Sequence, residues 1–268
     1  MYLKKSFLLI LFFSLFFAVQ ADEDELRNME NQAFQRGEYL KYRVFYDSWF
    51  TSWLTAGIGE VRVLEDSKKF HGRDTYHMVI EGNSVGMFNW FFKVRDRFES
   101  YVDEEALVPW KFIRKTREGD FSKDDTVIFN QFEHRAKSLT MERKIPPNTQ
   151  DIVSAFYVMR NLDVTHLEVN DELYVKFMLD DSVYNSKVIY LGKEVVKVKA
   201  GTFNALKFKP MVATGEVFDE QYPMTLWVSD DPNHVPLKVK SAVIIGSVTI
   251  ELAEYDQLAH PPSSKIKD

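Results

Sequence analysis

The sequence predicts an all-β protein with one or two short helices, folded as an antiparallel β-barrel or as a strongly curved sheet or sandwich. Roughly a dozen short stretches alternate apolar and polar residues with the period of two that is typical of strands. The segments between them carry the Gly, Asp and Pro residues that favour tight turns. Only one interior stretch has helical spacing, whereas a parallel α/β sheet needs a helix after nearly every strand. We therefore expect one helix that packs against or into an antiparallel sheet.

Residues 1–21 have the pattern of a cleavable secretory signal peptide. Lys4 and Lys5 precede an apolar run from Phe7 to Ala18, and Val19-Gln20-Ala21 offers small residues to a signal peptidase. The run is shorter than the roughly 20 residues that cross a bilayer, and no later segment reaches that length. We therefore expect export to the periplasm and no transmembrane segment after cleavage. Because the chain has no cysteine, we expect neither a lipoprotein nor a disulfide.

The composition limits the classes of partner. The chain has 34 basic and 40 acidic residues, and loss of the two signal lysines makes the mature chain more acidic still. An acidic exported protein is a poor candidate for binding nucleic acid or for electrostatic docking on an anionic membrane. With 45% hydrophobic residues, a chain of this length can bury a large core, and we expect a single antiparallel β domain over residues 22–256.

The predicted strands follow one another from residue 38 to residue 252. A short polar helix, ended by Gly37, is expected before them over residues 22–37. The polar, proline-rich tail over residues 257–268 is expected to be disordered. The alternating stretches predict strands at 38–50, 59–65, 73–82, 96–102, 109–118, 125–134, 137–144, 172–179, 184–192, 194–201, 202–212, 224–228 and 237–252.

The interior helix is predicted over residues 151–162. Asp151 is a good N-cap after two prolines, and Ile152, Phe156 and Met159 recur at helical spacing. Ser154 lies in its first turn, and Tyr157 and Arg160 share one face.

Arg160 is the most distinctive charge on this helix. It could bond strand-end carbonyls, or form a structural ion pair with Asp230 or Asp231 across the domain. The alternative is that it anchors a ligand in a pocket.

The densest polar cluster is Ser229–Pro236, with Asp230, Asp231, Asn233 and His234 between two alternating stretches. Proline, Asp, Asn and Ser favour tight turns, so the cluster predicts a hairpin loop. A metal or catalytic site is the alternative, but no calcium-loop pattern is present. None of the six histidines stands at the spacing of a zinc pair. We therefore expect no metal and no cofactor.

Gly82-Asn83-Ser84-Val85-Gly86 fits the G-x-S-x-G motif of serine hydrolases. That motif works at the end of a parallel strand in an α/β sheet, whereas the periodicity here is antiparallel. Ser84 is therefore predicted to be a strand-end residue. A serine hydrolase that uses Ser84 ranks third among the possible functions, and we expect no enzyme.

Aromatic residues interrupt the strand alternation in two places. Large cores and barrel rims need bulky side chains, which is the simplest explanation. The functional alternative is an apolar pocket or patch for a lipid, a glycan or a protein partner. The candidate ligand-binding residues are Trp49, Phe50, Trp53, Phe88, Trp90, Phe91 and Phe92.

Three blocks of the sequence resemble a bacterial exported family called domain of unknown function 3108. They are GEYLKYRVFY with AGIGEVRV, then DIVSAFYVMRNLD, then GTFNALKFKP leading to LWVSDDPNHVPLKV and IGSVTIEL. The second block holds Asp151, Ser154, Tyr157 and Arg160. The resemblance implies an exported, mostly β domain of bacterial envelopes, and it implies no catalytic residues.

These observations favour a periplasmic, non-enzymatic binding or envelope-assembly protein. Its curved sheet would hold an apolar ligand such as a lipid or lipid-linked glycan. The runner-up is a structural accessory factor that binds an envelope protein and has no small-molecule pocket.

Overall fold

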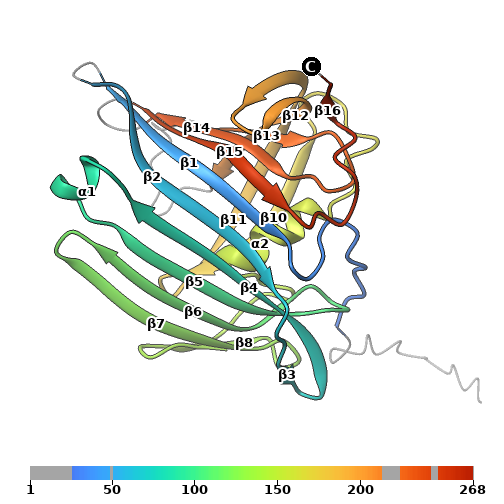
Figure 1. Ribbon diagram of the computed structural model, residues 1–268. Helices are drawn as coiled ribbons and strands as arrows, with labels where there is room; N and C mark the ends of the chain where they lie inside the picture. Colours follow the sequence, from blue (N-terminus) through green and yellow to red (C-terminus); the bar gives the residue numbers. More distant parts are fainter. Residues whose placement is uncertain (1–25, 49–50, 213–223, 243–246, 268) are drawn as a thin grey trace, which may run out of the picture.

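One large antiparallel sheet and two short helices make up the described part of the protein (Figure 1). The computed structural model describes residues 26–48, 51–212, 224–242 and 247–267. The helices are α1 (Phe88–Phe91) and α2 (Ile152–Arg160). The strands are β1 (Tyr39–Ser48), β2 (Thr51–Leu64), β3 (Lys69–Phe70), β4 (Arg73–Ser84), β5 (Arg95–Asp103), β6 (Pro109–Glu118), β7 (Phe121–Asn130), β8 (Arg135–Lys137), β9 (Glu142–Lys144), β10 (Glu172–Leu179), β11 (Ser182–Val198), β12 (Gly201–Val212), β13 (Met224–Ser229), β14 (Pro236–Ala242), β15 (Ser247–Asp256) and β16 (Lys265–Ile266).

The sheet curves strongly around α2 but is not closed by a continuous ladder of its described strands (Figure 1). Its strands pair in the order β10-β11-β12-β13-β14-β15-β1-β2-β4-β5-β6-β7-β8-β9, with β3 beside β4 and β16 beside β12. Beyond β9, Gln150 forms an isolated parallel bridge with β10: its N–H donates to Lys176 at 2.8 Å, and its carbonyl accepts from Met178 at 2.7 Å. The prediction of an all-β, antiparallel, strongly curved fold is confirmed.

The predicted alternation sets which side chains face the core. In β1, Leu40 and Tyr42 are buried whereas Tyr39 and Lys41 are only half-buried. Two of the predicted strands, 184–192 and 194–201, form the single strand β11. Gly192 has φ +102°, and the register against β12 shifts between Tyr190 and Gly192. A β-bulge at this glycine therefore lets the strand continue where the sequence indicated a break.

The N-terminal segment corrects one prediction, because residues 26–37 are not helical. The side chain of Arg27 donates to the carbonyls of Ala106 and Leu107, both at 2.8 Å. Phe34 is buried, and its ring makes edge contacts with Tyr76 and Tyr157. These long-range contacts hold the segment extended across the domain, where a free polar helix would have left Phe34 in water.

The C-terminal tail corrects another prediction, because residues 257–267 fold against the domain. β16 pairs with β12, and Ser264 is buried. The Ser264 hydroxyl donates to Asp231 at 2.5 Å, and the His260 N–H donates to the Asn233 side chain at 2.8 Å. The polar residues that suggested disorder are therefore partners for buried polar groups of the loop before β14.

α2 begins where the sequence predicts. Asp151 accepts hydrogen bonds from the N–H groups of Val153 (2.7 Å) and Ser154 (2.9 Å), while the Ser154 hydroxyl accepts from the Asp151 N–H at 2.9 Å. This reciprocal capping box fixes the first turn of the helix. Ser100 of β5 donates to the second carboxylate oxygen of Asp151 at 2.6 Å, which ties the helix to the sheet. Among the described helices, none is long and apolar enough to cross a membrane.

Candidate functional site

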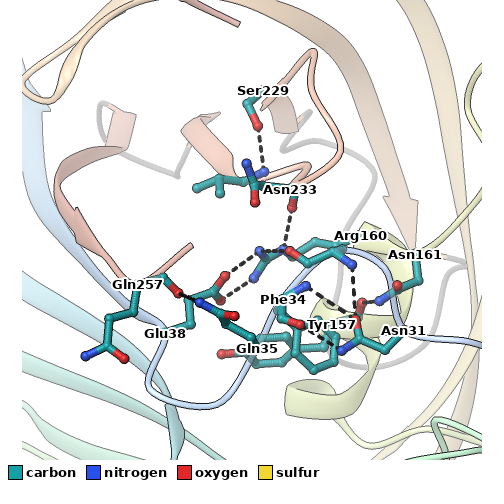
Figure 2. Close-up of polar contacts among 12 residues, drawn as sticks. Asn31, Phe34, Gln35, Glu38, Tyr157, Arg160, Asn161, Ser229, Asn233 and Gln257 are labelled. Carbon is teal, nitrogen blue, oxygen red and sulfur yellow. Dashed lines mark hydrogen bonds and ion pairs between the residues drawn. The ribbon is translucent and has the colours of Figure 1, made fainter. Parts of the chain in front are cut away.

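Arg160, at the end of α2, lies in a fully buried ion pair (Figure 2). Its guanidinium donates to both carboxylate oxygens of Glu38, at 2.6 and 2.8 Å. It also donates to the carbonyls of Asn233 (3.0 Å) and Ala33 (2.9 Å). Arg160 therefore joins the N-terminal segment, α2 and the loop before β14 through four hydrogen bonds of its guanidinium.

The predicted acidic partner of Arg160 is wrong, because Glu38 takes the place proposed for Asp230 or Asp231. Asp230 instead forms an ion pair with Lys193 at 2.7 Å near the surface. Asp231 is buried and accepts hydrogen bonds from Ser229 and Ser264. The prediction that Arg160 bonds strand-end carbonyls is wrong in detail, because the carbonyls that accept its hydrogen bonds belong to Asn233 in the loop before β14 and to Ala33 in the N-terminal segment.

The cluster at 229–236 is a hairpin loop, as predicted, because β13 and β14 pair directly on either side of it. The loop also contacts the helix, since His234 Nδ1 lies 2.7 Å from the Arg160 carbonyl. Within the described ranges, no group of three or more His, Cys, Asp or Glu side chains is placed to hold a metal ion. Asp231 accepts the hydrogen bonds that organise the turn and the C-terminal tail, whereas Asp230 pairs with Lys193.

A cavity of about 650 Å³ lies inside the curved sheet, between α1 and α2. This volume is within the ~300–1,000 Å³ that small-molecule sites commonly occupy. Most of its lining is apolar and comes from β1, β2, β4, β14 and β15, with Phe156 of α2 contributing to the wall. The lining residues are Tyr42, Val44, Phe45, Tyr46, Ala56, Gly57, Ile58, Gly59, Val61, Ile80, Glu81, Gly82, Asn83, Ser84, Phe88, Phe92, Val94, Asp96, Phe98, Glu118, Phe156, Pro236, Val239, Val248 and Ile250.

A second cavity of about 200 Å³ lies between the C-terminal half of α2 and the sheet. Phe156, Pro236 and Val239 line both cavities. The remaining residues of the smaller cavity are Met159, Arg160, Val164, Leu173, Val188, Leu206, Phe208, Met224, Leu226, Val228 and His234.

The polar groups of the larger cavity lie toward its two ends. Asp96 and Glu118 line it near α1, where burial and then the neighbouring Asp96 raise the pKa of Glu118. The negative charge of Glu81 is balanced by ion pairs with Arg62 and Arg97. At the α2 end, burial raises the pKa of the Tyr42 hydroxyl further above neutral pH.

The candidate aromatic residues lie in different environments in the structure. Phe88 and Phe92 line the larger cavity, whereas Trp90 and Phe91 of α1 point to solvent, with 87% and 76% of their surface exposed. Trp53 lies in β2, and of this residue only the backbone is described. Trp49 and Phe50 lie outside the described residues.

Ser84 is the last residue of β4, as predicted, and belongs to the cavity wall. Its hydroxyl donates to the Asn89 side chain at 2.8 Å and accepts from the Val94 N–H at 2.9 Å. These bonds hold α1 against the end of β4.

Sequence reasoning missed Glu38 and Tyr42 as site residues and noted Phe156 only as a helical core position. Glu38 directly precedes an alternating strand and looks like a solvated charge. Its only sequence signal is that it stands next to the first strand, and nothing local indicates a cation 122 residues away.

Comparison with known proteins identifies a similar fold and a sequence family. A search of curated proteins gives no significant match. The chain is similar to a crystal structure of a β-barrel-like protein of the domain of unknown function DUF1849 from Brucella abortus. The identity is 11%, the TM-score is 0.56, and the likeness covers 84% of this chain and 99% of that one.

Two further structures have lower TM-scores. A lipoprotein candidate from Parabacteroides distasonis is 12% identical, with a TM-score of 0.40 over 86% of this chain and 100% of that one. An exported-protein candidate with a YmcC-like fold from Bacteroides fragilis is 9% identical, with a TM-score of 0.38 over 85% of this chain and 99% of that one. The sequence model of the family "Protein of unknown function (DUF3108)" matches residues 41–253, and because this match spans most of the sequence, the chain belongs to that family.

Proposed function

We propose that this protein is an exported, periplasmic, non-enzymatic binding protein that holds the acyl part of a lipid or lipid-linked glycan inside its curved sheet. The observation that carries the proposal is the apolar cavity of about 650 Å³ between α1 and α2. Filling such a space with a hydrocarbon chain removes apolar surface from water at about 25 cal/mol per Å². The signal-peptide pattern of residues 1–21 supports export.

Native mass spectrometry of protein purified from its own periplasm tests the proposal. We expect a co-purifying mass that organic extraction removes and that is identified as an acyl lipid. A clean mass of the protein alone, together with no uptake of a fluorescent fatty acid, would contradict it.

A matched pair of variants connects binding to the cavity. Val44 lines the cavity, so Val44→Trp is expected to fill part of it and to lower lipid occupancy. Val195 is 57% exposed on β11, so Val195→Trp adds the same bulk outside the cavity and should leave occupancy unchanged. Equal lipid occupancy in both variants would show that the lipid does not bind in this cavity.

A second candidate function is an accessory factor that binds an envelope protein, favoured by the exposed Trp90 and Phe91 of α1. Large aromatic side chains are enriched in protein interfaces and seldom cluster on free surfaces. A stable protein partner that co-purifies with the wild type and is lost from Trp90→Ala would favour this function over lipid binding.

We also propose that Ser84 is not a catalytic nucleophile. Asn89 and Val94 engage the Ser84 hydroxyl, and both contacts hold structure at the cavity wall. Ser84→Ala is therefore expected to leave lipid occupancy intact. Labelling of Ser84 by a fluorophosphonate probe would instead favour a serine hydrolase.

A further inference from the structure

The two cavities share part of their lining at α2 and β14. Phe156 lines both, together with Pro236 and Val239 at the start of β14. One turn further along the helix, Met159 lines only the smaller cavity. Phe156 is half-buried: it packs against the hydrophobic core, contacts the Tyr157 ring and lines both cavities. The size of the side chain at this position therefore affects the space between the two cavities.

A buried hydroxyl lies at the same end of the larger cavity. Tyr42 lines that cavity and is 6% exposed, and its hydroxyl has no hydrogen-bond partner among the described residues. A buried donor without a partner is costly, so it favours any acceptor that enters the cavity. Glu38 and Arg160 lie nearby but are engaged with each other and with backbone carbonyls.

The polar groups at this end of the larger cavity favour a ligand with an uncharged hydrogen-bond acceptor. The Glu38–Arg160 pair has no net charge, and Tyr42 offers one neutral donor. A buried carboxylate would need a free cation or several donors to offset the loss of its hydration. An ester carbonyl needs one donor and loses little hydration on burial.

We infer that the two cavities are the arms of one site for a two-chain ester lipid. One acyl chain occupies each arm on either side of Phe156, and the Tyr42 hydroxyl donates a hydrogen bond to an ester carbonyl at the junction. This inference rests on the proposed function and names the ligand class of the same site.

The test compares lipids that differ only in the ester carbonyl. Because the smaller cavity of about 200 Å³ has room for only a short acyl chain, titrations would use dioctanoylglycerol, the matching dioctyl glycerol ether, which has the same chains without carbonyls, and octanoic acid. Wild type is expected to bind the diester about threefold to tenfold more tightly than the diether, as expected for one buried hydrogen bond. Tyr42→Phe should remove this preference by weakening only the diester.

Tyr157→Phe is the matched control. The Tyr157 hydroxyl is also buried without a partner among the described residues, yet Tyr157 lines neither cavity. This variant should keep the preference for the diester. Both changes delete an unpaired hydroxyl, so both variants should fold.

Phe156→Trp tests the two arms separately from the hydrogen bond. The larger ring should narrow the junction and weaken both two-chain lipids at least tenfold while octanoic acid still binds. The inference is overturned if the diester and diether bind equally to wild type, or if Phe156→Trp weakens octanoic acid as much as the two-chain lipids. If none of the three lipids binds wild type, the proposed function itself fails.

Discussion

Two regions of the domain, one around α2 (the α2 end) and one around α1 (the α1 end), use their unusual residues in opposite ways. At the α2 end, charged and polar groups are buried, and Arg160, Glu38, Asp151 and Asp231 all have partners within the protein. At the α1 end, apolar residues are exposed, with Trp90 and Phe91 pointing to solvent. Buried paired charges are expected to act on stability, whereas exposed aromatic side chains add little to stability and are free to contact something else.

The largest effect is expected from the buried ion pair. Arg160→Ala leaves Glu38 buried without its cation, and Glu38→Ala leaves Arg160 in the same position. Each should lower the free energy of unfolding by about 3–5 kcal/mol, and the double variant should lose less than the sum. Urea denaturation of the wild type, the two single variants and the double variant measures the coupling energy between Arg160 and Glu38.

Lys193→Ala is the control, because it removes a cation from an exposed pair with Asp230 and should cost less than about 1 kcal/mol. If Arg160→Ala cost no more than Lys193→Ala, the α2 end would not depend on buried charge.

The second effect concerns the pH dependence of stability at Asp151. Burial raises the pKa of Asp151 to about 6 against the pull of its hydrogen bonds. In the unfolded chain the group ionises near pH 3.8, so its stabilising contribution is complete below that pH and is lost as the pH rises through about 6. We expect wild type to lose up to about 3 kcal/mol relative to Asp151→Asn across this window.

Thermal unfolding of both proteins from pH 4 to pH 7 gives this difference, and comparison with the variant cancels the other titrating groups. A constant difference across the window would mean that Asp151 ionises in the folded state as it does in the unfolded state.

A smaller effect separates the two acids of the hairpin loop. Asp231→Ala removes the acceptor of Ser229 and Ser264 and should cost about 1–3 kcal/mol. It should also release the C-terminal tail, which hydrogen exchange of residues 257–267 would detect. Asp230→Ala, at the exposed pair with Lys193, should cost less than about 1 kcal/mol and leave the tail protected.

Calcium or zinc should not raise the melting temperature of the wild type, because we expect no metal to bind the loop. A metal-dependent rise that Asp231→Ala abolishes would show that the loop is a metal-binding site.

The smallest effect is expected at α1. Trp90→Ala should change the free energy of unfolding by no more than about 0.5 kcal/mol, because its ring is 87% exposed. Trp110→Ala is the matched change in the core, where the ring is 0% exposed, and should cost about 3–5 kcal/mol. Guanidinium unfolding curves of both variants test the comparison. A large loss from Trp90→Ala would show that the α1 end is packed against another part of the protein.

The sequence alone predicted the features that depend on near neighbours. Period-two alternation predicted the antiparallel strands, because each strand has one face toward the core. Asp151 predicted the start of α2, since its side chain bonds N–H groups two and three residues away. Asp230, Pro232 and their neighbours predicted the hairpin loop for the same local reason.

The tertiary structure decided what depends on residues far apart in the chain. Glu38 became the partner of Arg160 because the N-terminal segment crosses the domain and brings a carboxylate to the end of α2. The same crossing buries Phe34 and prevents the helix that the polar pattern of this segment indicated. The cavities arise from the curvature of the whole sheet, so they have no signature in any one stretch of sequence. Local propensities are worth tenths of a kcal/mol per residue, whereas burial of an aromatic ring or a paired charge is worth several, and the long-range contacts prevail.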